Sequence, residues 1–330
     1  GLSGLNYRWM DLYGEGLPGI LTETNQAWYY KPNQGEGQFG HQTLVAQKPS
    51  NLVGSYALSD FDSDGNPNLV MFAGRQAGYC EYDRDKDQWQ GYRPFPCAPV
   101  LEEMGTSAQW IDLNGDGRSD IIISKQDRFT WYPSEGKEGF GAPVEFANPG
   151  VENAAQAPAI EEDLRLNYLF ADMSGDGLLD RVRIRNGRVE YWPQLGNGRF
   201  GDAIVMENAP SFDFENQFDL GRLRLADLDG SGTADLIYLG RGEITYWNNA
   251  GGNCFLQGVR ISGLPYIDNL SSTQVLDFLG DGTPCLVWSS PLNSQAHAPL
   301  QYLHLTNGIQ PRLLLSVDNA MGKRVDLTYY

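Results

Sequence analysis

Short apolar segments recur along the whole chain and are separated by turns rich in glycine, aspartate and asparagine. The segments are a few residues long and carry mainly β-branched and aromatic side chains, which favour strands. No stretch of 12 residues or more keeps a 3.6-residue period, so we expect no substantial helix. Four segments follow one another before the pattern starts again, which is typical of four-stranded antiparallel meanders.

A nine-residue acidic window marks each repetition of this pattern. Its first residue is always Asp, its second is Leu, Phe or Met, and its sixth is Gly; five of the six windows also have Gly at the fourth position. The first Asp residues lie 49 to 60 positions apart. The windows, called windows 1 to 6 below, are residues 11–19, 60–68, 112–120, 172–180, 227–235 and 277–285.

This repeat predicts an all-β fold, a six-bladed β-propeller of four-stranded antiparallel blades. Four strands per unit and a period of 49–60 residues are typical of propeller blades, and six units close one ring. A flat β-sandwich is the alternative, but it gives no reason to repeat one loop six times. The predicted blades are approximately residues 5–50, 51–103, 104–162, 163–219, 220–269 and 270–330.

We expect residues 1–330 to form a single propeller domain that is excised from a larger chain, because both ends look cut. The chain begins at Gly1 without a signal-like segment, and it ends in the strand-like segment 325–330. Residues 312–330 are predicted to form a hairpin around Asp318–Gly322. This hairpin either completes the last blade or leads into a further domain.

Charge and composition exclude several classes of function. The chain has 24 basic and 42 acidic residues, a net charge of −18, which would repel nucleic acid over most of the surface. Hydrophobic residues make up 41 % of the chain, too many for a disordered protein. Nowhere do 18 apolar residues run together, so direct membrane insertion is not expected. Sixteen of the 42 acidic residues lie in the 54 positions of the six windows, so the negative charge is concentrated there.

Four of the windows carry oxygen-bearing side chains at positions 1, 3, 5 and 9. Alternate positions of a tight loop can direct several oxygens at one centre, and calcium prefers oxygen ligands. The candidate ligands are Asp60, Asp62, Asp64 and Asn68 in window 2; Asp112, Asn114, Asp116 and Asp120 in window 3; Asp172, Ser174, Asp176 and Asp180 in window 4; and Asp227, Asp229, Ser231 and Asp235 in window 5. Structural Ca²⁺ is therefore the one cofactor that the sequence predicts.

A purely structural interpretation of the windows stays open beside the calcium hypothesis. Asp at position 1 caps backbone N–H groups, and Gly tolerates a positive φ, so the same residues favour a tight turn without metal. Windows 1 and 6 have Tyr13, Gly19, Leu279 and Cys285 at would-be ligand positions, and we expect them to bind no ion. The four cysteines lack CxxC spacing, which argues against zinc and favours mostly buried free thiols.

Enzymatic interpretations find little support. The three histidines, His41, His297 and His304, lie in unlike surroundings, and none is near a GxSxG element or a phosphate-binding loop. A hydrolase with a metal at the centre of the ring is a third-ranked hypothesis. Aromatic residues of the third strand of each unit, such as Trp28, Trp131, Trp192 and Trp247, invite a sugar-binding hypothesis, but packing between blades is the simpler prediction.

Two resemblances follow from particular motifs. The loop D-x-[DN]-G-D-G-x-x-D, followed by an aromatic strand and G-x-G-x-F-G, resembles the FG-GAP (VCBS) repeats of integrin-type propellers. A closer resemblance, over nearly the whole chain, is to the propeller region of the B component of tripartite Tc insecticidal toxins, in the SpvB-like family. It rests on YWPQLGNGRFG (191–201), LRLADLDGSGTADLIYL (223–239), ITYWNNAGG (244–252) and SVDNAMGKRVDLTYY (316–330).

The Tc resemblance implies a non-enzymatic docking and gating module of a secreted toxin. In that family the B and C components form a shell around a cytotoxic enzyme, and the propeller of the B component closes one end. The implied partners are the C component and the channel-forming A component, on which the propeller docks for translocation of the enzyme. The alternative is a calcium-dependent adhesion or glycan-binding FG-GAP propeller.

Overall fold

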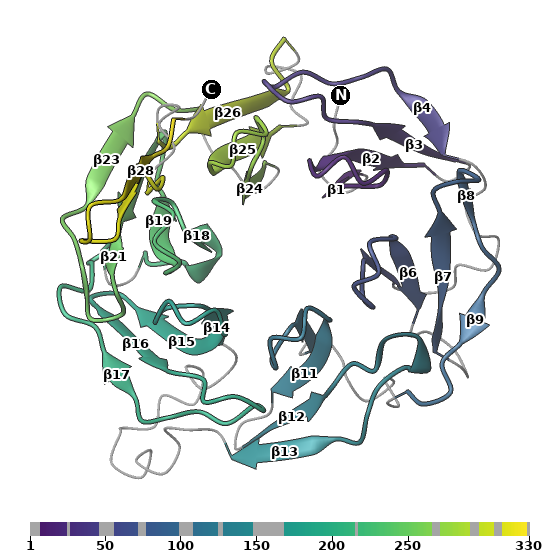
Figure 1. Ribbon diagram of the computed structural model, residues 1–330, viewed down its shortest axis with the longest axis horizontal. Coiled ribbons are helices and arrows are strands. Elements are labelled where there is room, and N and C mark those ends of the chain that lie inside the picture. The colour runs from purple at the N-terminus through teal and green to yellow at the C-terminus, as the bar shows by residue number, and fades with distance from the viewer. Residues whose placement is uncertain are drawn as a thin grey trace.

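The computed structural model describes residues 7–24, 27–45, 56–71, 77–98, 108–124, 128–147, 168–214, 217–265, 271–290, 297–306 and 312–328. Within these ranges the protein is all-β, and short 3₁₀ turns such as η3 (Gly136–Glu138) and η5 (Leu220–Arg222) are its helical elements. Six antiparallel sheets stand around a common axis, so the protein is a six-bladed β-propeller (Figure 1). The fold predicted from the repeat is therefore confirmed.

Each blade is a meander whose first strand lies nearest the axis (Figure 1). The apolar segments immediately before and after each acidic window form the first two strands of the blade. The strands of blades 1 to 3 are β1 (Tyr7–Met10), β2 (Gly19–Glu23), β3 (Trp28–Lys31) and β4 (Thr43–Val45); β5 (Tyr56–Ser59), β6 (Asn68–Met71), β7 (Gly78–Asp83), β8 (Gln88–Trp89) and β9 (Arg93–Pro94); and β10 (Ala108–Ile111), β11 (Asp120–Ser124), β12 (Arg128–Tyr132) and β13 (Val144–Ala147).

Blades 4 and 5 repeat this arrangement, and blade 6 has three strands among the described residues. In blade 5 a small hairpin, β21–β22, interrupts the connection between β20 and β23. The strands are β14 (Tyr168–Ala171), β15 (Asp180–Arg185), β16 (Arg188–Trp192) and β17 (Ile204–Val205); β18 (Leu223–Ala226), β19 (Asp235–Leu239), β20 (Glu243–Trp247), β21 (Asn249–Ala250), β22 (Cys254–Phe255) and β23 (Val259–Ser262); and β24 (Ser272–Leu276), β25 (Cys285–Ser289) and β26 (Leu300–His304).

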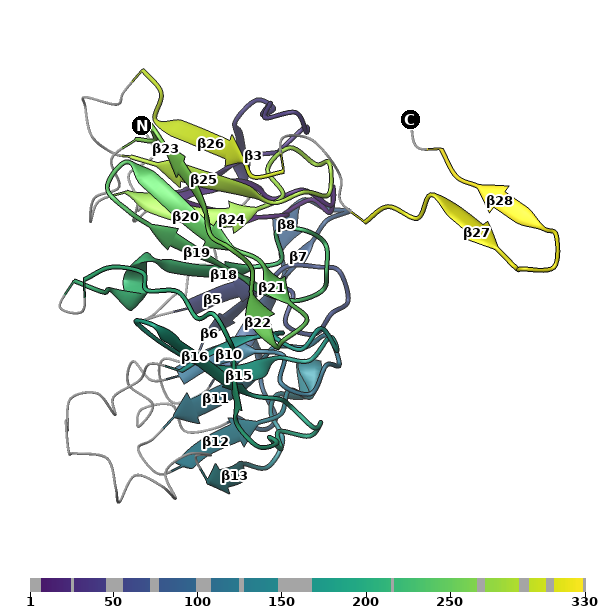
Figure 2. The same cartoon turned by 90° about the vertical axis from the view of Figure 1, so that its left-hand side faces the viewer.

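The C-terminal segment does form the predicted hairpin, but it adds no strand to blade 6. Strands β27 (Ser316–Asp318) and β28 (Arg324–Asp326) pair only with each other, and all their residues are exposed. Figure 2 shows the hairpin projecting away from the ring. Of the two possibilities left open by the sequence, completion of the last blade is therefore wrong for the described residues.

The hydrophobic core lies between the blades, with one cluster of buried side chains at each of the six joints. The joint between blades 6 and 1 is closed by Phe278 and Val287 packing against Trp9 and Phe39. A hydrogen bond from the Asn33 side chain to the carbonyl of Phe278, 3.0 Å, also crosses this joint. The ring is therefore closed by side-chain packing and hydrogen bonds between its first and last blades.

Aromatic side chains of the third strands fill these joints, as the packing interpretation predicts. Trp28, Trp131 and Trp192 are buried, and Trp247 packs half-buried against the cluster between blades 4 and 5. All four cysteines are free thiols; Cys80 and Cys285 are buried, whereas Cys97 is exposed and Cys254 is half-buried. No helix in the described part of the chain is long and apolar enough to cross a membrane.

Candidate functional site

The six acidic windows form a ring, because each one joins the innermost strand of a blade to its second strand (Figure 1). Two pairs of neighbouring windows are joined by hydrogen bonds. The hydroxyl of Ser63 in window 2 donates to the carbonyl of Gly117 in window 3. The backbone N–H of Ala234 in window 5 donates to the carbonyl of Asp172 in window 4, 2.6 Å away. This ring is where the predicted ligand residues are gathered, so it is the candidate functional site.

Position 2 of every window is a buried anchor for the next joint. Leu12 lies in the cluster between blades 1 and 2, Phe61 in the one between blades 2 and 3, and Met173 in the one between blades 4 and 5. The side chains of Leu113, Leu228 and Phe278 occupy the corresponding places in the other three joints. The restriction of this position to Leu, Phe or Met therefore reflects packing between blades.

Position 1 holds the loop in shape in all six windows. Its carboxylate accepts a hydrogen bond from the backbone N–H of the Gly at position 6, and this Gly has φ between 77° and 88° in every window. In window 3, Asp112 also accepts from Gly115 and Asp116, at 2.8 and 3.1 Å. A side chain other than glycine rarely adopts this φ, which explains the Gly at position 6. The turn forms equally in windows 1 and 6, which lack the full ligand set.

Position 9 serves as a buried acceptor for backbone groups. The carboxylates of Asp120, Asp180 and Asp235 are fully buried. Each accepts the N–H of position 2 on one oxygen, at 2.8 to 3.0 Å, and the N–H of the residue 14 positions further along on the other, at 2.7 to 2.9 Å. In window 2, Asn68 accepts from the N–H of Phe61, 3.1 Å away. These bonds fasten each window to the end of the third strand.

Windows 1 and 6 make the same position-2 contact with different atoms. The hydroxyl of Tyr30 accepts from the N–H of Leu12, 3.3 Å away, and a Cβ on Gly19 would collide with this hydroxyl. In window 6 the sulfur of Cys285 interacts with the backbone of Phe278. The position-9 residue is thus part of the loop scaffold in windows with and without the predicted ligands.

Burial without a cationic partner perturbs the position-9 carboxyls. Removal from water raises the pKa of Asp120 and of Asp180, although the backbone donors act in the opposite direction. The same burial, aided by the charges of Asp229 and Asp227, raises the pKa of Asp235 to about 6. Folding therefore places three carboxylates in surroundings that disfavour their charged form.

The predicted ligands come together most closely in windows 2 and 5. Among the described residues, carboxylate oxygens of Asp60, Asp62 and Asp64 lie within 4.8 Å of one another, and so do those of Asp227, Asp229 and Asp235. In window 3 the side chain of Asn114 donates to Asp116, 3.1 Å away. The position-5 residues of windows 3 and 4, Asp116 and Asp176, each accept the N–H of position 7. Ser174 is the position-3 residue of window 4. Calcium binding in the four windows stays a prediction.

Basic side chains from other segments approach windows 2, 5 and 6. Lys137, in η3 of blade 3, contacts Asp62 and Asp64 of window 2. The guanidinium of Arg312 donates to Asp229 of window 5, with an N–O distance of 3.0 Å. In window 6 the Nε2 atom of His304 lies 3.5 Å from a carboxylate oxygen of Asp281. The sequence did not indicate these contacts: Lys137 and Arg312 lie in other repeat units than their partners, and His304 follows Asp281 by 23 residues within the sixth unit.

In three blades, a polar side chain after the third strand is hydrogen-bonded to the window of the preceding blade. Asn249 donates to the carbonyl of Met173 at 2.9 Å, and Arg84 donates from Nε to the carbonyl of Leu12 at 3.2 Å. Asn33 makes the equivalent bond to Phe278, described above. Sequence reasoning missed these residues, although one signal was available: polar residues stand 14 positions after position 9 in four units.

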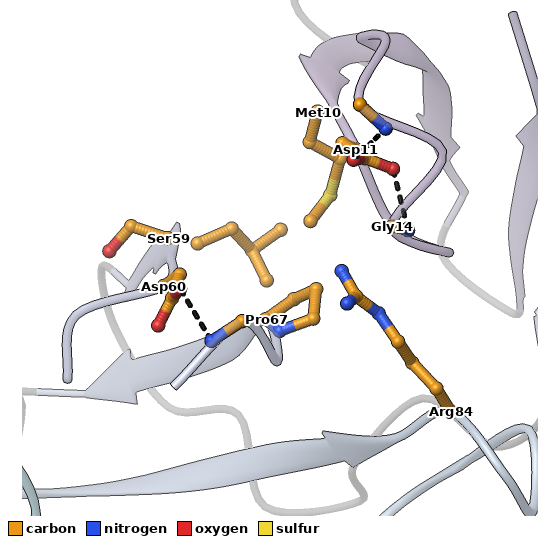
Figure 3. Close-up of a pocket in the computed structure, with 10 residues that line it drawn as sticks. Met10, Asp11, Gly14, Ser59, Asp60, Pro67 and Arg84 are labelled. Atoms are coloured by element: carbon orange, nitrogen blue, oxygen red, sulfur yellow. Dashed lines mark hydrogen bonds between the residues drawn. The ribbon is translucent and has the colours of Figure 1, made fainter. Parts of the chain in front are cut away.

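A cavity of about 480 Å³ opens between windows 1 and 2. Asp11 and Asp60 line it from the two sides, and the guanidinium of Arg84 points into it from the end of β7 (Figure 3). Both carboxylates accept backbone N–H groups of their own loops, at 2.7 to 3.2 Å. The cavity thus combines one cationic side chain with two carboxylates already engaged in their turns.

Comparisons with known proteins show a similar propeller in Tc toxin chains. No protein-family model and no curated protein sequence matches the chain. Among solved structures, a chain of the Photorhabdus luminescens Tc holotoxin pore matches 98 % of this chain with 28 % identity and a TM-score of 0.77. The chain is similar to a segment of a Tc toxin protein. A TcdB2–TccC3 structure matches 97 % of the chain with 26 % identity and a TM-score of 0.57.

The chain spans about 15 % of the length of these Tc toxin chains. A lectin from Agrocybe aegerita that recognises non-reducing terminal N-acetylglucosamine matches 87 % of the chain and 75 % of its own length, with 17 % identity and a TM-score of 0.60. At that identity the likeness shows the fold alone. The predicted relationship to Tc toxins is therefore supported at the level of the propeller, and the FG-GAP and SpvB-like assignments stay predictions.

Proposed function

We propose that this propeller belongs to a toxin-complex shell protein, where it closes the shell formed with the C component and docks on the channel-forming A component. It then acts as the gate through which the cytotoxic enzyme leaves the shell, without catalysis of its own, and it is secreted as part of the complex. The observation that carries the proposal is the match of 98 % of the chain, at 28 % identity, to a segment of the Tc holotoxin pore chain.

The construction of the ring supports a docking role. Each window is held by carboxylate–backbone hydrogen bonds, and each joint has its own core cluster, so the window ring offers a rigid surface. The windows carry 16 acidic residues and a single basic one, Arg118. A partner that docks on the window ring should therefore present basic side chains, and its association should weaken as salt is added.

The adhesion and glycan-binding alternative has weaker support. The lectin with the same fold shares 17 % identity, and the third-strand aromatic residues that would stack on sugars are mostly buried. Retention of a glycan from an array, with loss of binding in EDTA, would favour this alternative over docking.

A chimera tests the proposed function. This propeller would replace the aligned segment of the Photorhabdus luminescens Tc chain, and the control chimera would carry the Agrocybe aegerita lectin propeller, which has the fold without the identity. We expect the first chimera to assemble with the channel-forming component and to release cargo, and the lectin chimera to fail. A first chimera that is folded by circular dichroism but does not bind the channel component would contradict the proposal.

A further inference from the structure

Window 2 gathers more negative charge than its nearest cation neutralises. The carboxylates of Asp60, Asp62 and Asp64 share one locus, and Glu81 of β7 joins them from the third strand of the same blade. The Nζ atom of Lys137 lies 2.6 Å from Asp64, 2.6 Å from Glu81 and 3.3 Å from Asp62. Three carboxylates thus contact one ammonium group, and a fourth, that of Asp60, lies beside Asp62 and Asp64.

Asp62 presents an oxygen that the ammonium group does not satisfy. Its side chain is 6 % exposed, and its Oδ1 atom has no hydrogen-bond partner in the described structure. A buried carboxylate oxygen without a donor is unfavourable unless a cation contacts it.

Lys137 belongs to the neighbouring blade, and its side chain has room to move away from the carboxylates of window 2. It stands in η3 (Gly136–Glu138) of blade 3, and its side chain is 38 % exposed, so its flexible stem has solvent to move into. Gly136 fits directly against Asp62, where an added Cβ would lie 3.2 Å from the Asp62 Cβ. The ion pairs of this lysine therefore link blade 3 to window 2, next to the close contact of Gly136 with Asp62.

We propose that Ca²⁺ and the ammonium group of Lys137 compete for the same carboxylates in window 2, where the sequence already predicts a calcium site. Asp60, Asp62, Asp64 and Glu81 supply carboxylate oxygens only, the donor type that suits calcium, which takes about six to eight oxygen ligands in flexible geometries. One Ca²⁺ offsets two of the four negative charges, whereas Lys137 offsets one. Calcium binding thus breaks the ion pairs that link Lys137 of blade 3 to blade 2.

Window 5 lacks a buried carboxylate oxygen without a hydrogen-bond partner among the described residues. Its cluster includes Asp235, but both oxygens of Asp235 accept backbone N–H groups, at 2.7 and 2.8 Å. No free carboxylate oxygen comparable to that of Asp62 points into the cluster among the described residues. The competition is therefore assigned to window 2.

Amine-reactive footprinting of the 330-residue chain tests the competition directly. The probe is Ca²⁺ alone, and the readout is the labelling rate of each lysine by mass spectrometry. Lys137 should react slowly in EDTA and several-fold faster in saturating Ca²⁺. Lys86, which pairs with Asp83 on the surface at 2.8 Å, is the matched control and should not change. A Lys137 rate that is the same with and without Ca²⁺ would overturn the proposal.

Calorimetric titration with Ca²⁺ gives a second, independent readout. Lys137→Met should strengthen binding roughly five- to tenfold because it removes the competing charge. Asp62→Asn should abolish this binding event, and Lys86→Met should leave it unchanged. Equal affinities in the wild-type protein and in a folded Lys137→Met variant would mean that lysine and metal do not share the site, and so would binding that survives Asp62→Asn.

Discussion

Replacement of Arg181 by methionine should stabilise the protein, which is unusual for a change in a protein core. Arg181 lies on β15 at the joint between blades 3 and 4 and is 1 % exposed. Its two terminal guanidinium nitrogens have no hydrogen-bond partner in the described structure. The guanidinium carbon lies 3.5 Å from the ring centre of Tyr168, so an aromatic face is its main electrostatic contact.

The size of the effect follows from the pKa of the group. Burial, reinforced by the charge of Arg183, lowers the pKa of Arg181 from the ordinary value of an arginine to about 10. That difference corresponds to roughly 3 kcal/mol of destabilisation, present at all pH values below about 10 and relieved only in strong alkali. The cation–π contact returns about 1 kcal/mol, and methionine keeps most of the apolar stem. Arg181→Met should therefore add about 1–2 kcal/mol of stability at pH 7.

Arg183→Met is the matched control and should have the opposite sign. Arg183 lies two residues along the same strand but forms an ion pair with Glu190, which is 3 % exposed. Its removal leaves Glu190 with Arg188 alone, at 3.0 Å, and should cost about 1–3 kcal/mol.

Thermal and urea unfolding of the two variants and the wild-type protein would measure both effects. A stabilisation of 1–2 kcal/mol should raise Tm by roughly 2–4 °C in a domain of this size. If Arg181→Met instead lowered stability by 1 kcal/mol or more, the reasoning would fail, because the guanidinium would then have favourable partners that outweigh its burial.

Three further predictions concern the windows and the C-terminal hairpin. In EDTA the protein should gain stability as the pH falls from 7 to 5. The raised pKa of Asp235, about 6, means that burial of its charged form destabilises the fold above that pH, and this penalty is gone below about pH 4. A plot of Tm against pH would show the gain, and Asp235→Asn should reduce it. Asp277→Ala in window 6 removes the acceptor for the N–H groups of Gly280 and Gly282 and should lower the free energy of unfolding by about 1–3 kcal/mol. A loss that differs between calcium and EDTA would refute the scaffold role. Removal of residues 313–330 should change Tm by less than about 1 °C, since β27 and β28 are exposed, and a larger loss would show that the hairpin stabilises the ring.

The sequence predicts those features that every blade shares. Asp at position 1, the apolar residue at position 2 and Gly at position 6 recur in register, and each proves to have one structural role that is also repeated. A pattern that recurs six times in register does not arise by chance, so the number of blades, the positions of the windows and the aromatic packing could all be inferred from the sequence.

Features that occur once in the ring could not be predicted in this way. Lys137 meets Asp64 across 73 residues and one blade boundary, and nothing in either segment marks the other as its partner. Arg181 stands in a strand whose pattern looks amphipathic, so its complete burial depends on the aromatic rings of two neighbouring blades. The three strands of blade 6 among the described residues, and the hairpin that pairs with none of them, likewise depend on how the ring closes, which a local pattern does not encode.

The turns of windows 1 and 6 decide how the calcium hypothesis should be tested. Both windows keep the carboxylate bonds to the position-6 N–H, at 2.8 and 2.9 Å, although they lack the full ligand set. The loop geometry is thus supplied by the backbone and one Asp, and a metal ion is not required to form it. Chelation should therefore leave the ring folded and act locally, at window 2, where Lys137 offers a replacement charge. An adhesion propeller that depends on calcium should instead lose its binding altogether in EDTA, so one chelation experiment separates the two functions.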